Sequence, residues 1–120
     1  MSVMSSEKRL KETFAYTEMY RNIYAMPEDL QGVYVFCNRH NGRCIYIGET
    51  TSFKARLNKH WKGTHNDELQ LWLKGCPESI IVGYWEVKGD KMWLKRVQDR
   101  LIYKWNPETN IDGVPDKKDN

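Results

Sequence analysis

The 120-residue chain is long enough for one domain with a small core, and no apolar run in it approaches the ~20 residues needed to cross a bilayer. Its hydrophobic fraction of 40% and charged fraction of 29% are typical of a globular protein. The net charge of +3 permits a nucleic-acid partner without requiring one.

The first segment lacks the apolar core of a signal peptide, and the 3 cysteines have no metal-like spacing, so we expect reduced thiols in a cytoplasmic protein. Residues 5–25 are predicted to be helical, because Leu10, Phe14 and Ile23 lie roughly on one side. Pro27 ends this run. Residues 1–31 therefore form a predicted helical extension, which either covers a sheet face or contacts a second subunit.

Two strands are predicted next, at 32–37 and 43–47, because both runs are rich in Val, Ile, Tyr and Phe. The intervening RHNG sequence is typical of a turn. Later elements follow in chain order: a helix at 53–63 capped by Ser52, a helix at 66–74, a strand at 79–87 and a helix at 90–104. Residues 111–120 are predicted to be a disordered tail.

Arg56 and His60 are four residues apart in a predicted helix and therefore share a face. That face flanks an apolar stripe of Phe53, Leu57 and Trp61. The pair has two interpretations. They are solvated polar residues, as on most helices, or a guanidinium and an imidazole aimed together at an anion such as a phosphate.

The last predicted helix has one polar residue on its apolar face. Gln98 falls inside a cluster formed by Leu94, Val97, Leu101, Ile102 and Trp105. A polar side chain in such a place is costly unless something pairs with it. Either a neighbouring backbone group satisfies the amide, or the position faces a polar site cut into the core.

These segments together resemble the GIY-YIG nuclease family. GVY at 32–34 and YIG at 46–48 correspond to the two halves of the family name. TTSFKARLNKH resembles the segment with the family's arginine, here Arg56, and its following His or Tyr, here His60. QDRLIYKWNPETN resembles the closing segment, with Asn110 at the asparagine position. The resemblance covers residues 32–110, and five elements in order at compatible spacing make it specific.

The resemblance implies a nuclease domain over residues 32–110 with a small α/β (α+β) fold, a three-stranded, mainly antiparallel sheet flanked by helices. It implies metal-dependent hydrolysis of DNA phosphodiester bonds with Mg²⁺ or Mn²⁺. Arg56 would neutralise charge on the phosphoryl oxygens, with His60 beside it. Tyr34 would deliver or receive the proton of the attacking water. The remaining implied roles are phosphate or water orientation by Tyr46, backbone approach at Gly48 and anchoring of the chain end by Asn110.

Gln98 departs from the family, which has a metal-binding glutamate at this position. A glutamine offers Mg²⁺ only a neutral carbonyl oxygen, so we expect weak metal binding and impaired cleavage. Two explanations stay open. The chain is an engineered, inactivated nuclease, or it is a natural member that binds nucleic acid or protein without cutting. Because the rest of the site matches the family, the first explanation is favoured.

DNA is the expected partner, and Lys54, Lys59, Lys62 and Lys95 are candidates for contacts with its phosphates. Such contacts give affinity but no sequence information. No Cys and His spacing predicts a zinc finger, so sequence-specific cutting would need a homodimer or a partner subunit, with the N-terminal segment as the candidate contact.

The resemblance also makes a prediction about strand register. If one site uses both Tyr34 and Tyr46, the two phenols must project from the same face of the hairpin. A two-residue turn at Asn41-Gly42 would place them on opposite faces, because a one-residue slip reverses every side chain. We therefore predict an odd number of loop residues, or a bulge, in this hairpin.

Overall fold

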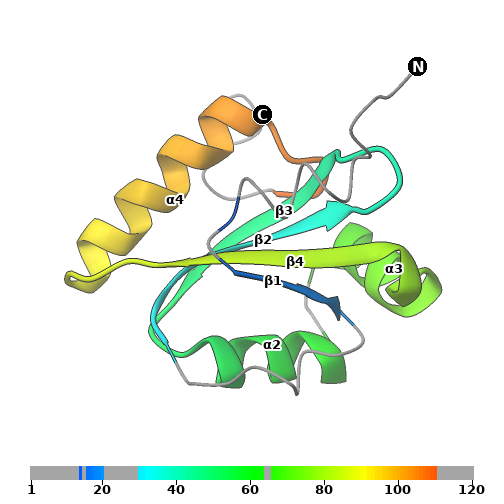
Figure 1. The fold of residues 1–120 in the computed structure, drawn as a ribbon, viewed down its shortest axis with the longest axis horizontal. Helices are drawn as coiled ribbons and strands as arrows, with labels where there is room; N and C mark the ends of the chain where they lie inside the picture. Colours follow the sequence, from blue (N-terminus) through cyan, green and yellow to red (C-terminus); the bar gives the residue numbers. More distant parts are fainter. Residues whose placement is uncertain (1–13, 15, 21–29, 64–65, 111–120) are drawn as a thin grey trace.

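The computed structural model describes residues 14, 16–20, 30–63 and 66–110 of the chain. At its centre is an antiparallel sheet with strand order β1-β4-β2-β3 (Figure 1). Its strands are β1 Tyr16–Met19, β2 Gly32–Asn38, β3 Cys44–Thr50 and β4 Ile80–Glu86. The predicted three-stranded antiparallel sheet is confirmed as β4-β2-β3, and β1 adds a further strand beside β4.

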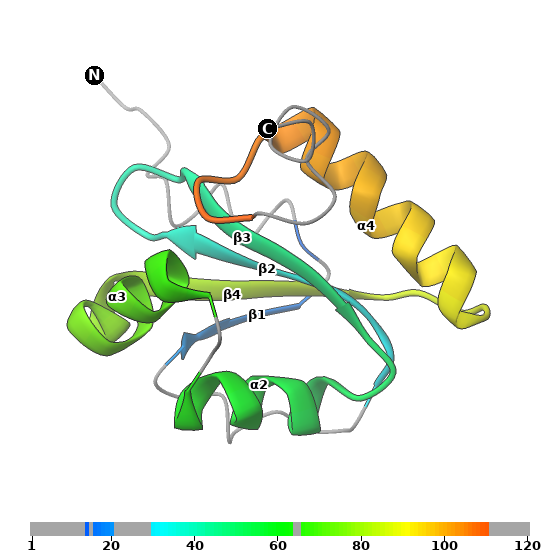
Figure 2. The same cartoon turned by 180° about the vertical axis from the view of Figure 1, so that it is seen from behind.

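Helices cover both faces of the sheet. Helices α2, Phe53–Lys62, and α3, Asp67–Gly75, lie on one side, and α4, Lys91–Trp105, lies on the other (Figures 1 and 2). A short 3₁₀ turn at Pro77–Ser79 joins α3 to β4. These bounds agree with the predicted elements to within a few residues. The result is a three-layer α+β domain with the sheet in the middle.

The N-terminal helix prediction is wrong where the structure describes that segment. Tyr16–Met19 is a strand, and it pairs with β4 from Tyr16 opposite Tyr84 to Met19 opposite Ile81. The edge of β4 offers unpaired backbone groups, and pairing with them outweighs the helical periodicity that the apolar residues suggested. The rest of the predicted helix lies outside the described residues, as does the predicted tail at 111–120.

The hairpin contains the predicted bulge. Tyr34 lies opposite Gly48 and Phe36 lies opposite Tyr46, but the register shifts between Phe36 and Cys37, which pairs with Cys44. The extra residue restores the parity that the turn alone would have broken. Tyr34 and Tyr46 consequently share one face of the sheet, as predicted.

The alternation of side chains divides the core into two clusters. Tyr34, Phe36 and Val82 face α2 and α3, where they join Phe53, Leu57, Leu69 and Leu73. Val33, Val35 and Ile47 face the opposite way and pack with Ile102 of α4. Each face of β2 is thus buried under its own helical layer, and the phenols belong to the α2 side.

Helix α2 is rotated relative to the predicted apolar stripe. Phe53 and Leu57 are buried as expected, but Trp61 is 37% exposed and packs against Tyr20 with ring centroids 5.3 Å apart. His60 is the buried residue of this turn, at 6% exposure. The predicted N-cap is present, because the Ser52 hydroxyl accepts a hydrogen bond from the backbone N–H of Ala55.

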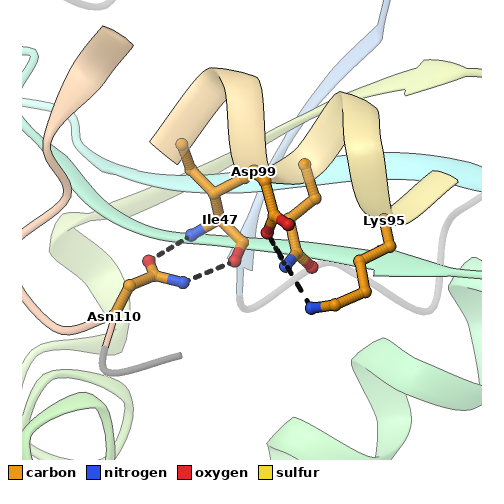
Figure 3. A network of polar contacts seen from close by, with 5 residues as sticks. Ile47, Lys95, Asp99 and Asn110 are labelled. Atoms are coloured by element: carbon orange, nitrogen blue, oxygen red, sulfur yellow. Dashed lines mark hydrogen bonds and ion pairs between the residues drawn. The ribbon is translucent and has the colours of Figure 1, made fainter. Parts of the chain in front are cut away.

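The segment after α4 covers the outer edge of β3. The helix ends at Asn106, which adopts a left-handed conformation with φ of 47°, and Pro107 prevents its continuation. The chain then returns along β3, where the backbone N–H of Thr109 donates to the carbonyl of Ile45 at 2.9 Å. Asn110 makes the next contact with the strand (Figure 3). The unpaired edge of β3 is thereby closed.

Candidate active site

A buried pair of polar side chains lies between the sheet and α2. The Tyr34 hydroxyl, from the middle of β2, is 2.7 Å from Nε2 of His60, from the last turn of α2. Tyr34 is 1% exposed and His60 is 6% exposed, so both groups are removed from bulk water. The interpretation of His60 as a solvated surface residue is therefore wrong.

Tyr46 completes an aromatic cluster with this pair. Its ring centroid is 6.1 Å from that of Tyr34 and 5.6 Å from that of His60. Phe36, directly opposite Tyr46, packs against His60 from the sheet side with a centroid distance of 5.3 Å. Tyr46 is only half-buried, so it is the phenol through which this cluster meets the surface.

Gly48 faces the Tyr34 ring across the two strands. A Cβ atom at position 48 would lie 2.3 Å from both Cζ and the hydroxyl oxygen of Tyr34, much closer than any real contact. Only glycine leaves room for the phenol at this point. The close backbone approach expected at Gly48 is therefore an approach to Tyr34 itself.

The environment of Tyr34 favours its neutral form. Burial raises the pKa of Tyr34 well above its usual range, and the neighbouring Tyr46 side chain adds to the increase, while Arg56 acts in the opposite direction. Tyr34 is consequently a protonated phenol at neutral pH. It forms a hydrogen bond with His60 rather than offering a ready phenolate base.

Arg56 lies on α2 one turn before His60 and is half-buried. The positive charge of Arg56 lowers the pKa of Tyr34, in opposition to the effect of burial. Arg56 forms no ion pair with a carboxylate of the part of the chain that the structure describes. Four of the predicted site residues therefore lie together: Tyr34, Tyr46, Arg56 and His60.

Gln98 is a half-buried residue of α4, the helix that packs on the other face of the sheet from α2. Its side-chain amide donates to Oδ1 of Asp99 at 3.4 Å, and Asp99 also pairs with Lys95 at 3.9 Å (Figure 3). Among the described residues, the Nε2 group of Gln98 is thus paired with a carboxylate and not with a backbone group. We had not singled out Asp99 from the sequence, although its i, i+4 spacing from Lys95 is a recognisable signal.

The side chains around Gln98 do not fit a tightly held divalent cation. Position 98 supplies a neutral amide, and the adjacent carboxylate of Asp99 is already paired with Lys95. Within residues 14, 16–20, 30–63 and 66–110, no group of three or more His, Cys, Asp or Glu side chains could hold a metal ion. That position 98 faces a polar site cut into the core therefore stays a prediction.

Asn110 binds the backbone of β3. Its side-chain oxygen accepts from the backbone N–H of Ile47 at 2.8 Å, and its amide donates to the Ile47 carbonyl at 2.8 Å (Figure 3). The side chain thus imitates one residue of a neighbouring strand. This anchors the closing segment next to Tyr46 and Gly48, which flank Ile47 in the sequence.

The predicted phosphate-binding lysines divide between two faces of the domain. Lys54, Lys59 and Lys62 are exposed on α2, on the side of the phenol cluster. Lys95 is exposed on α4 and pairs with Asp99, on the other side of the sheet. A single straight duplex lying on α2 would therefore not contact all four lysines.

The sequence profile of the GIY-YIG catalytic domain matches residues 30–91 of the chain. This range contains β2, β3 and α2. The chain therefore belongs to the GIY-YIG family. No curated protein matches it in sequence.

Solved structures of the GIY-YIG N-terminal endonuclease domain of UvrC from Thermotoga maritima share the fold. The magnesium-bound domain has 24% sequence identity and a TM-score of 0.58, with coverage of 78% of this chain and 96% of that chain. A point mutant of the same domain, also bound to its divalent cation, has 22% identity and a TM-score of 0.59, with coverage of 78% and 94%.

Proposed function

We propose that this domain is a metal-dependent DNA endonuclease of the GIY-YIG type whose cleavage is impaired because Gln98 replaces the glutamate of the family. The observation that carries the proposal is the cluster of Tyr34, Tyr46 and His60, with the charge of Arg56 close enough to act on Tyr34. Family membership supports the nuclease class. The UvrC domain, which is bound to magnesium, supports a divalent cation as the cofactor of such a site.

Each side chain of the cluster has a physical task in this proposal. Arg56 neutralises charge that develops on the phosphoryl oxygens, because no carboxylate of the described protein competes for it. Tyr46, the half-buried phenol, orients the phosphate or the attacking water. Tyr34 and His60 hold Tyr46 in place and carry the proton that hydrolysis releases, through their 2.7 Å contact.

Gln98 weakens only the metal-binding part of the site. In the active family arrangement the cation supplies charge stabilisation at the scissile phosphate. Here the neutral amide of Gln98 attracts the cation less strongly than a carboxylate would. The chain should still bind DNA, since the lysines of α2 do not depend on position 98.

The test is the Gln98→Glu variant, assayed for nicking of supercoiled plasmid with Mg²⁺ or Mn²⁺. Nicking and a measurable Mg²⁺ affinity by calorimetry should appear together in this variant and be absent or weak in the parent chain. Gln70→Glu adds the same charge on α3 and is the matched control, which should stay inactive. Strong Mg²⁺ binding and nicking by the parent chain would contradict the impairment.

A non-catalytic binding module is the alternative function. Its specific support is the side chain of Gln98, whose Nε2 donates to Asp99 and whose carbonyl oxygen carries no charge to attract a cation. Unchanged DNA binding without cleavage by Gln98→Glu would favour this alternative.

In either case we propose that the protein acts where DNA is, in the cytoplasm, nucleoid or nucleus, and that a homodimer or partner subunit would use the N-terminal segment. Among the described residues, no helix has the length and apolar content of a membrane span.

A further inference from the structure

Helix α4 concentrates positive charge more strongly than the chain as a whole. Its 15 residues contain one acid, Asp99, and five bases, so the helix carries a net +4 against +3 for the whole chain. The bases are Lys91, Lys95, Arg96, Arg100 and Lys104. All five are exposed, and Lys95 is paired with Asp99, so most of this positive charge faces the surroundings.

The outward face of α4 also presents large apolar side chains. Tyr103 is 80% exposed, Met92 is 69% exposed and Trp93 is 49% exposed. Arg96, Arg100 and Tyr103 follow one another at i, i+4 and i+7, so they lie along one side of the helix. Guanidinium groups interleaved with an exposed aromatic ring are the combination that holds phosphates and stacks on bases.

The two arginines of this face form no ion pair with any carboxylate that the structure describes. Among the described residues, the ion pair of α4 joins Lys95 to Asp99, and neither Arg96 nor Arg100 contacts a carboxylate. Unpaired guanidinium groups bind planar anionic groups such as phosphate in a bidentate manner. The charge on this face is therefore available to a partner.

The outward face of α4 points away from the phenol cluster. Helix α2, with Arg56, lies on one side of the sheet and α4 lies on the other (Figures 1 and 2). Both helices are basic, and a rigid duplex held against α2 lies with the sheet between itself and the outward face of α4. A nucleic-acid segment on α4 must therefore be a second one.

We propose that the outward face of α4, formed by Met92, Trp93, Arg96, Arg100 and Tyr103, binds the phosphate backbone of a second DNA segment while the α2 side holds the first. The choice of DNA as the partner rests on the proposed function. The charge of the helix selects a polyanion, and the aromatic side chains give it contacts with sugars or unstacked bases.

The test is a bridging assay with the full chain. One 30-base-pair duplex is attached to beads, and retention of a second, fluorescent duplex is measured over a range of salt concentrations. The parent chain should retain the second duplex. Arg96→Ala and Arg100→Ala should each retain less and lower the slope of log retention against log salt by about one, the value for one lost phosphate contact. Tyr103→Ala should also reduce retention.

Lys74→Ala is the matched control, because it removes an exposed positive charge from α3. Circular dichroism verifies that each variant is folded. Sedimentation verifies that each variant has the same oligomeric mass in solution as the parent chain. Bridging by Arg100→Ala equal to that of Lys74→Ala overturns the inference. A variant that loses bridging and also sediments as a smaller assembly than the parent overturns it as well. In that case α4 would be a contact between copies of the chain.

Two further measurements separate this inference from its alternatives. If Arg96→Ala and Arg100→Ala lose binding to vesicles containing phosphatidylserine but bridge DNA normally, the face binds membranes and the inference is wrong. Nicking is scored separately in the Gln98→Glu chain. Bridging without any nicking overturns the proposed cleavage alone, whereas nicking with bridging that is insensitive to the α4 variants overturns the second DNA surface alone.

Discussion

The hydroxyl of Tyr34 and Nε2 of His60 lie 2.7 Å apart in a space that is almost closed to water. One residue comes from the centre of the sheet and the other from the helix that follows the hairpin. Their contact fixes the position of α2 over the sheet and thereby places Arg56, one turn earlier, beside the phenols. The proposed active site is consequently built on side chains of the buried core.

Removing the phenol of Tyr34 should change how stability depends on pH. The pKa of Tyr34 is raised by burial in the folded chain, whereas the unfolded value is about 10. The folded state therefore binds more protons above about pH 10, and stability should fall as the pH rises through that range. Tyr34→Phe should remove part of this fall in urea unfolding measured from pH 8 to pH 11.

Tyr103→Phe removes an exposed phenol and serves as the control for this experiment. It should keep the parental decline in stability above about pH 10. At neutral pH, Tyr34→Phe should also cost about 1–3 kcal/mol, because His60 loses its partner in a buried place. A parental pH profile for Tyr34→Phe would show that the buried phenol is not the group responsible.

Gly48→Ala should displace Tyr34. The new methyl group would lie 2.3 Å from the phenol, so the ring or the strand must move. We expect a loss of about 1–3 kcal/mol in the free energy of unfolding. Gly75→Ala, where a Cβ meets nothing within 4 Å, is the matched control and should be tolerated.

A double-mutant cycle identifies the cause of the Gly48 effect. If the cost is a clash with the phenol, Gly48→Ala should be much less destabilising in a Tyr34→Ala background. Equal costs in the two backgrounds would mean that the backbone at position 48, and not the ring of Tyr34, demands glycine.

Asn110→Ala should loosen the closing segment. It leaves both the N–H and the carbonyl of Ile47 without their side-chain partner, at an expected cost of about 2–3 kcal/mol. Asn110→Asp keeps an acceptor for the N–H but cannot donate to the carbonyl at neutral pH, so it should also destabilise. Hydrogen exchange at the amide of Ile47 reports the effect directly, and unchanged protection in Asn110→Ala would contradict this anchoring role.

Arg56→Ala should abolish nicking in a Gln98→Glu background while leaving most DNA binding intact. The guanidinium acts on the reacting phosphate, whereas exposed cations along α2 hold the rest of the backbone. Lys59→Ala removes a nearby charge from the same helix and should weaken binding without abolishing cleavage. Nicking at an undiminished rate by the Arg56 variant would refute the phosphate-stabilising role.

The local elements of the domain could be predicted from sequence because their signals are local. Ser52 caps α2 through a bond to a residue three positions later, and the Val, Tyr and Ile of β2 and β3 suit half-buried strands. The prediction of an odd loop or a bulge followed from the family resemblance together with the alternation of side chains. Once both phenols must serve one site, the alternation of side chains leaves few registers, and the observed shift at Phe36 and Cys37 is one of them.

Tertiary structure decided the features that depend on contacts between residues far apart in the chain. Residues 16–19 became a strand because β4 had an unpaired edge, which no periodicity in the segment records. His60 is buried and Trp61 partly exposed because the packing of α2 against Tyr34 set its rotation, which a helical wheel leaves free.

The sequence alone identified Gln98 as a polar residue on an apolar helix face, and family resemblance gave that position its meaning. Only the fold showed that its amide contacts Asp99 and that α4 lies across the sheet from the phenols. The sequence states which residue occupies position 98, so the absence of a glutamate there can be read without a structure. The distances between residues far apart in the chain arise from packing, which depends on all the elements at once.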